Sequence, residues 1–169
     1  ARLAAEAFKA ARVTVLDSRQ LSLGVGFLVQ SAAQAAAGGE SLSDILKALN
    51  SQIERSYVFA VLETTEFLRR SGRISGFQNG LGTLLQVKPL LKMHNGVAES
   101  ERIRTRKKAI ERLIALVTEV SPVEKLALVH TNNDSGAQEL WQRTRHLFPG
   151  IDDPISVDVT PVIGAHIGP

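Results

Sequence analysis

The sequence contains no cysteine, few aromatic residues and no long apolar run. Without cysteine it can form neither a disulfide scaffold nor a thiolate site, and this composition is typical of a cytoplasmic protein. No stretch approaches the roughly 20 apolar residues that a membrane-spanning helix needs. Because aromatic residues make up only 5% of the chain, Leu, Val, Ile and Ala must fill the core. A hydrophobic content of 44% over 169 residues is enough for one globular domain.

Several kinds of functional site are also missing from the sequence. There is no G-x-S-x-G turn, so the usual hydrolase nucleophile is absent. The four histidines are His94, His130, His146 and His166, and no two of them have the spacing of metal ligands. A metal site is therefore not expected. The net charge of +3 is too small to indicate a nucleic-acid-binding protein by itself.

Strand and helix signals alternate along the chain. Apolar stripes with a 3.6-residue period follow Ser41 and Thr105 and predict two capped helices. Asn95-Gly96 lies between two extended runs and predicts a β-hairpin, because a type I′ turn needs positive φ at both residues. Other predicted strands cover 13–16, 57–63, 125–130 and 155–159, and other predicted helices cover 26–37, 65–70, 77–85 and 134–148. We expect an α/β fold of α+β character, with a mixed sheet and flanking helices.

Both ends of the sequence are typical of a piece of a longer protein. The first residue is not Met, and ARLAAEAFKAAR has the composition of the second half of a helix. The last stretch, PVIGAHIGP, places His166 between Gly164 and Gly168 in an apolar tail. His166 can belong to a disordered end, to a packed core, or to half of a site whose other half lies outside this sequence.

The stretch GVGFLV follows a predicted strand and opens a predicted helix, as a dinucleotide-binding fingerprint does. Gly24 and Gly26 supply its first two glycines, but Val29 stands where the third glycine belongs. The alternative is that both glycines permit close packing. Ser18 and Ser22 lie after the strand, where α/β proteins place ligands, although turn and cap positions explain them equally well.

Two segments are rich in arginine and lysine. In ERIRTRKK, Arg106 and its neighbours open a helix, where the helix dipole disfavours cations, so an anionic partner is expected. The alternatives are a solvated basic face and a surface for nucleic acid. In RRSGRIS, Arg73 lies in a loop between Gly72 and Gly76 and can reach a phosphate or carboxylate, or cap helix carbonyls.

The motifs taken together resemble the DegV family, the fatty-acid-binding proteins that serve bacterial fatty acid kinase. The resemblance covers LDSRQLSLGVG, LETTEFLRRSGRIS, LLQVKPLLKMHNGVAE, RTRKKA and GAHIGP, in this order and over nearly the whole chain. It implies two α/β domains in the complete protein. Residues 1–17 are then the remnant of the N-terminal domain, and residues 18–169 form the C-terminal domain.

The resemblance implies a lipid-binding protein without a cofactor, not an enzyme. A long-chain fatty acid lies in an apolar tunnel between the domains, and an ATP-dependent kinase phosphorylates its carboxylate to an acyl phosphate. The implied ligand-binding residues are His166, Ser18, Ser22, Gly24, Gly26, Phe27, Leu28, Phe77, Leu81, Leu84 and Leu85. Each apolar member can equally be an ordinary core residue. The residues implied to face the kinase are Arg73, Arg104 and Arg106.

A second hypothesis is an enzyme that acts on a small phosphorylated substrate. In that case GVGFLV and the RSGRIS loop grip the phosphate, and His166 is the general acid or base.

Overall fold

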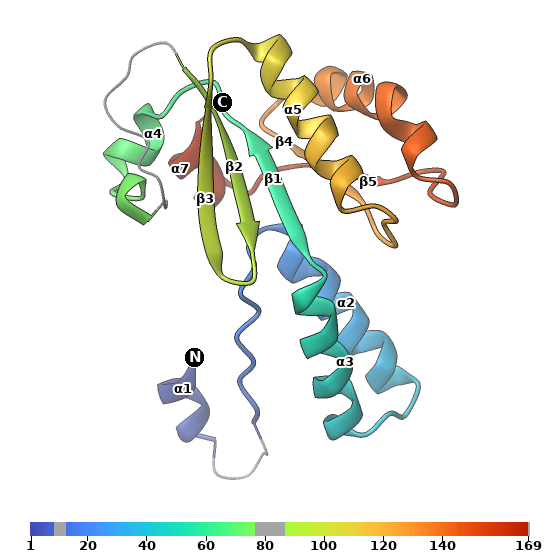
Figure 1. The fold of residues 1–169 in the computed structure, drawn as a ribbon. Coiled ribbons are helices and arrows are strands. Elements are labelled where there is room, and N and C mark those ends of the chain that lie inside the picture. The colour runs from blue at the N-terminus through green and yellow to red at the C-terminus, as the bar shows by residue number, and fades with distance from the viewer. Residues whose placement is uncertain (9–12, 77–86, 169) are drawn as a thin grey trace.

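The computed structural model describes residues 1–8, 13–76 and 87–168, and Figure 1 shows their arrangement. The α-helices in this part of the chain are α1 (Arg2–Glu6), α2 (Leu23–Ala37), α3 (Leu42–Glu54), α4 (Glu66–Arg70), α5 (Arg106–Glu119), α6 (Asp134–Thr144) and α7 (Pro161–Ile167). The strands are β1 (Tyr57–Val61), β2 (Lys88–His94), β3 (Val97–Ile103), β4 (Ala127–His130) and β5 (Ile155–Asp158). Short 3-10 helices cover Ile74–Gly76 and Arg145–Leu147.

The strands are divided between two sheets. The first has the order β1-β2-β3 and is antiparallel, with Tyr57 opposite His94. The hairpin predicted at Asn95-Gly96 is confirmed, and both residues have positive φ, 48° and 81°. The second sheet pairs β4 with β5 in parallel, and α6 lies between them in the chain. The predicted α/β class with flanking helices is confirmed, although its antiparallel and parallel strands do not share one sheet.

Helix α5 runs beside the antiparallel sheet (Figure 1). Its predicted cap is confirmed, since Thr105 Oγ1 accepts a hydrogen bond from the backbone N–H of Lys108 at 3.3 Å. The fully buried Leu90 lies at the centre of the sheet. Helices α4 and α7 meet the sheet through a cluster in which Leu62 and Leu68 are buried. These helices fix the end of β1 that leads into α4.

Helices α2 and α3 form a hairpin that projects from the rest of the molecule (Figure 1). Ser41 begins α3 as predicted, with its hydroxyl accepting from the N–H of Asp44 at 3.2 Å. The two helices pack through a cluster of buried residues, Leu28, Leu49 and Ile53. The hairpin therefore has a small core of its own.

The strand predicted at 13–16 is wrong. These residues pair with no strand in the part of the chain that the structure describes, and Val13 and Val15 are exposed. An apolar run indicates a tendency to be buried, but a strand also needs a neighbour that completes its hydrogen-bond ladder. The strand predicted at 57–63 ends at Val61, two residues early.

Two helix predictions also need correction. Helix α2 begins at Leu23 instead of residue 26, because Ser22 occupies the N-cap position with φ 51°. The tail expected after the last strand forms helix α7, with Pro161 in its first turn, where the missing proline N–H costs nothing. The helix predicted at 77–85 lies outside the described residues.

Candidate functional site

A cavity of about 1500 Å³ extends along β1. Every residue from Arg55 to Glu63 lines it, so it follows the whole strand and both of the strand's ends. The opposite walls come from α5, through Ile110, Leu113, Ile114 and Val117, and from the four residues of β4. Ligand pockets in proteins usually measure about 300–1,000 Å³ and are mostly apolar. This cavity is larger than that, and aliphatic side chains form most of its walls.

His166 lies on α7 and lines this cavity. Its Nδ1 atom is buried and has no hydrogen-bond partner among the described residues. A buried polar atom without a partner costs free energy, so such an atom marks a place where a ligand group or water would bind favourably. Of the three possibilities that the sequence left open, a disordered end is excluded by the helix.

The end of α7 is held by close packing. Ile167 packs against the cluster of Leu62 and Leu68. Gly168 follows with φ 77°, and a Cβ at this position would lie 2.3 Å from Cδ2 of Phe67 in α4. Only glycine allows the chain to pass so close to the ring, and this contact fixes where α7 presents His166.

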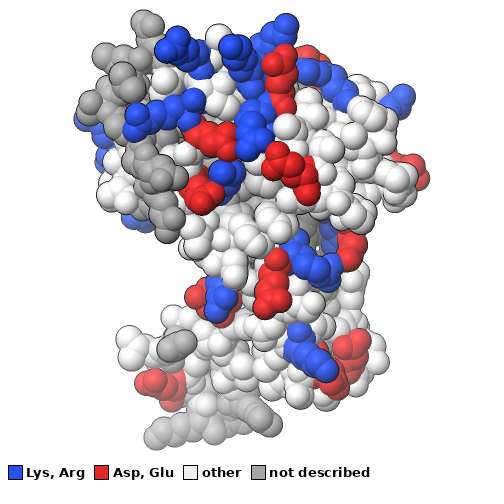
Figure 2. All heavy atoms as spheres, in the orientation of Figure 1, with Lys and Arg blue, Asp and Glu red and all other residues white. Residues whose placement is uncertain are grey.

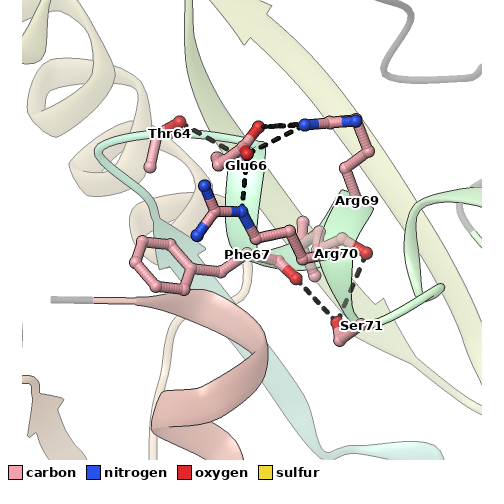
Figure 3. A network of polar contacts seen from close by, with 7 residues as sticks. Thr64, Glu66, Phe67, Arg69, Arg70 and Ser71 are labelled. Carbon is pink, nitrogen blue, oxygen red and sulfur yellow. Dashed lines mark hydrogen bonds and ion pairs between the residues drawn. The ribbon is translucent and has the colours of Figure 1, made fainter.

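Polar contacts in turn hold α4, as Figure 3 shows. Glu66 forms ion pairs with Arg69 at 2.8 Å and Arg70 at 2.7 Å, and these two guanidinium groups lower the pKa of its carboxyl. Thr64 Oγ1 accepts from the N–H of Glu66 at 3.1 Å, while Thr65 at the N-cap position makes no side-chain cap hydrogen bond. Ser71 Oγ donates to the carbonyl of Phe67 at 2.7 Å. The helix that supports Gly168 is therefore braced at both ends.

Arg73 differs from the two arginines of α4. It lines the cavity, and it forms no ion pair with any acidic group that the structure describes. Arg106 also lines the cavity, but Glu63 lies 3.5 Å from its guanidinium group. Among the described residues, Glu63 therefore partly neutralises Arg106, whereas Arg73 can pair with an anion that enters the cavity.

The start of α2 forms another part of the cavity wall. Ser22 lines the cavity, and its side chain makes no cap hydrogen bond. A Cβ built on Gly24 would lie 3.1 Å from Gln20 Oε1 and 3.3 Å from Val58 Cγ2, and one on Gly26 would lie 3.1 Å from Leu23 Cδ2. Side chains of the protein itself occupy the space beside both glycines. This arrangement favours the close-packing interpretation of GVGFLV over a phosphate loop.

The structure brings together six of the residues singled out in the sequence. Those that line the cavity are Ser22, Gly24, Phe27, Arg73, Arg106 and His166. Ser18 and Gly26 lie outside it, with Ser18 Oγ accepting from the N–H of Gln20 at 3.4 Å. Leu28 is 4% exposed and packs between α2 and α3, so it is an ordinary core residue in this structure. Arg104 is exposed between β3 and α5. Phe77, Leu81, Leu84 and Leu85 lie outside the described residues.

The sequence did not single out several groups that line the cavity. His130, at the end of β4, lies 3.1 Å from Asp158 and 3.6 Å from Asp134. The i,i+4 spacing of His130 and Asp134 was visible in the sequence, whereas the contact with Asp158 depends on the pairing of β4 with β5.

No group of His, Cys, Asp and Glu in the described ranges could hold a metal ion. None of the described helices is both long and apolar enough to cross a membrane.

One sequence profile of a protein family matches the chain over its whole length. It is the profile of the DegV family, described as uncharacterised proteins, and it matches residues 1–169. A DegV domain-containing protein of Clostridium acetobutylicum is 33% identical over 168 residues, which are 97% of this chain and 58% of the relative. Another, of Streptomyces coelicolor, is 34% identical over 161 residues, which are 93% of this chain and 57% of the relative. The chain thus spans less than two thirds of the length of these relatives.

Solved structures of similar proteins have the same fold. A DegV family protein of Thermus thermophilus, described as binding fatty acid, is 32% identical with a TM-score of 0.78, covering 99% of this chain and 61% of that one. DegV of Bacillus subtilis, described as a fatty acid binding protein, is 30% identical with a TM-score of 0.82 at the same coverage. Because the family profile matches every residue and these similarities extend over nearly the whole chain, the protein belongs to the DegV family.

Proposed function

We propose that this protein binds a long-chain fatty acid, with the acyl chain in the cavity along β1. The observation that carries the proposal is a cavity of about 1500 Å³ with mostly apolar walls, lined by His166, whose buried Nδ1 has no hydrogen-bond partner among the described residues. The similar proteins of Thermus thermophilus and Bacillus subtilis are described as binding fatty acids. Both share at least 30% of their aligned residues with this chain.

The dimensions of the cavity fit an acyl chain. The cavity follows β1 over Tyr57–Val61, four residue steps or roughly 13 Å at about 3.3 Å per residue, and continues past both ends of the strand. An extended acyl chain advances roughly 1.3 Å per carbon, given C–C bonds of about 1.5 Å, so about 10 carbons lie along the strand and the rest of a long chain extends beyond it. Each buried methylene contributes about 0.8 kcal/mol, so the apolar walls supply most of the affinity.

The carboxylate of the fatty acid is the group that the polar part of the wall would hold. We assign this role to His166, whose buried Nδ1 has no partner among the described residues, and to the hydroxyl of Ser22. Arg73 lines the same cavity and can contribute a charge-assisted hydrogen bond. Gly24 and Phe27 shape the adjoining wall, and Phe77, Leu81, Leu84 and Leu85 remain proposed acyl contacts.

The exposed basic residues support a proposal for how the bound lipid is used. Figure 2 shows Lys and Arg side chains gathered along the upper edge of the molecule, over the start of α5. We assign Arg73, Arg104 and Arg106 to a surface that receives an ATP-dependent kinase, which converts the bound carboxylate to an acyl phosphate. A basic surface favours encounter with an acidic or phosphate-bearing partner. In this role the protein presents a substrate and does not itself catalyse.

The complete protein, in this proposal, is cytoplasmic and has two domains. Residues 1–17 would then belong to an N-terminal domain and residues 18–169 to a C-terminal one. The relatives are long enough for a second domain, because the chain covers 57% to 58% of their length.

Native mass spectrometry of the intact protein tests the proposal. We expect a retained long-chain fatty acid. His166→Ala should weaken its binding roughly 10- to 100-fold, since a hydrogen bond to a charged group contributes about 1.5–3 kcal/mol. His146→Ala, which changes an exposed histidine, is the matched control. A ligand-free spectrum together with no uptake on titration would exclude the proposed function.

The two roles are separated by a second set of variants. Arg104→Ala changes an exposed arginine outside the cavity, and it should leave fatty acid binding unchanged and slow acyl phosphate formation by the kinase, with Arg143→Ala on α6 as the control. If His166→Ala and Arg104→Ala weakened fatty acid binding equally, the assignment of separate surfaces would be wrong.

A further inference from the structure

The segment 17–22, here called the wall loop, leads into α2 and forms part of the cavity wall. Leu21 and Ser22 in the loop, and Leu23 and Gly24 directly after it, line the cavity. The loop has no regular secondary structure until the first turn of α2. Its position, and so the shape of this part of the wall, must depend on contacts with other parts of the chain.

Three hydrogen bonds join the wall loop to distant residues within the described structure. The N–H of Gly96 donates to the carbonyl of Arg19 at 3.0 Å. Arg19 Nη1 donates to Asn95 Oδ1 at 2.8 Å, and Gln20 Nε2 donates to the carbonyl of Ser56 at 2.8 Å. Two of these bonds end on the β2–β3 turn, and the third ends on the residue before β1. Because the antiparallel sheet also carries the cavity wall of β1, these bonds tie the loop to that wall.

The turn and the loop are also adjacent in space. A Cβ on Gly96 would lie 3.4 Å from Cβ and 3.5 Å from Cγ of Arg19, which is van der Waals contact. Arg19 itself has φ 49°, a conformation that non-glycine residues keep only when their surroundings hold them in it. The hairpin turn therefore contacts a residue of the wall loop that has an uncommon backbone conformation.

Gln20 connects the loop to β1 from the other side. Its side chain lies directly beside Gly24, where a Cβ would come within 3.1 Å of Gln20 Oε1 and within 3.3 Å of Val58 Cγ2. The carbonyl of Ser56 that accepts from Gln20 also lies 3.1 Å from His94 Nδ1. One carbonyl thus joins the wall loop, the end of β2 and the start of β1.

We propose that the β2–β3 turn clamps the wall loop, and that Gly96, Arg19 and Gln20 are positioning residues that set the affinity for the fatty acid. None of the three residues lines the cavity. They act through Ser22 and Gly24, which do. The proposal rests on the proposed function, and it gives the hairpin a role in the site as well as in the fold.

A pair of glycine variants in the intact protein tests the clamp. Gly96→Ala and Gly39→Ala change glycines of nearly equal φ, 81° and 79°, but nothing lies within 4 Å of a Cβ on Gly39. Both variants should lower the urea midpoint, because both strain the backbone. Only Gly96→Ala should speed hydrogen exchange in the wall loop and weaken binding of a fluorescent fatty acid, by roughly tenfold if the pre-formed wall is lost. Gln20→Ala should act in the same direction, with Gln138→Ala as its surface control.

The outcomes separate the two proposals. If Gly96→Ala and Gly39→Ala affect exchange and affinity equally, the clamp is wrong. If exchange in the wall loop rises while affinity stays unchanged, the loop is clamped but its position does not set the affinity, and the inference is overturned. If the unmodified protein binds no fatty acid at all, the proposed function fails. Hydrogen exchange then still decides whether the turn holds the loop.

Discussion

Replacing Gly168 by alanine is the change that most directly tests how α7 is held in place. The residue has φ 77° and ψ −173°, a combination that glycine alone adopts readily. A side chain there costs about 1–2 kcal/mol of backbone strain. Its Cβ would also lie 2.3 Å from Cδ2 and 2.5 Å from Cε2 of Phe67, so the ring must move, at about 1–3 kcal/mol. The expected loss in the free energy of unfolding is therefore about 2–5 kcal/mol.

Differential scanning calorimetry measures this loss. In a protein of this size, each kcal/mol lowers Tm by about 2–4 °C, so Gly168→Ala should lower it by roughly 5–20 °C. Gly39 also has positive φ, but nothing lies within 4 Å of a Cβ at this position. Gly39→Ala should therefore show only the loss of stability that comes from backbone strain. Phe67→Leu should restore part of the loss in the Gly168→Ala protein, because a smaller side chain can move away. If Gly168→Ala and Gly39→Ala unfold at the same temperature, the contact with Phe67 does not hold α7.

Two further predictions concern the sheet and its covering helix. The Arg112 guanidinium lowers the pKa of the Glu101 carboxyl, so the ion pair stabilises the fold at higher pH and is lost as pH falls through that lowered pKa. Glu101→Gln should therefore make the free energy of unfolding depend less steeply on pH in the acid range. An unchanged slope in that range would contradict the prediction. Thr105→Ala removes the cap of α5 and should lower the unfolding free energy by about 1 kcal/mol in urea titrations. Thr118→Ala, with its hydroxyl bonded within α5, is the control, and equal losses from both would argue against the cap.

Features with a local cause could be predicted from the sequence. The turn at Asn95-Gly96 follows from the backbone freedom of two adjacent residues, and Ser41 and Thr105 cap helices through hydroxyls three residues from their donors. The start of α7 also had a local signal in Pro161, which pattern reading missed because the helix is short. These signals need no knowledge of the remaining chain.

Features that depend on distant neighbours could not be predicted in the same way. The run 13–16 has strand composition but no partner strand among the described residues. An apolar residue has the same pattern whether it lines a cavity, as Phe27 does, or fills a core, as Leu28 does. Whether such a residue lines a cavity or fills a core depends on which other part of the chain packs against it. Phe27 and Leu28 are adjacent in α2 and have different surroundings for this reason. His130 likewise meets Asp158 only because β4 pairs with β5.

The size of the cavity along β1 has a consequence for the life of the protein in a cell. Protein interiors are normally close-packed, whereas the cavity along β1 offers about 1500 Å³ that a ligand can fill. A ligand that fills the space stabilises the folded state by mass action, by about 2.7 kcal/mol at a free concentration 100 times its Kd. Such a difference changes the unfolded fraction roughly a hundredfold, which is the population that proteases remove. If the ligand is a fatty acid, the steady-state amount of this protein would rise and fall with the supply of lipid, without any change in its synthesis.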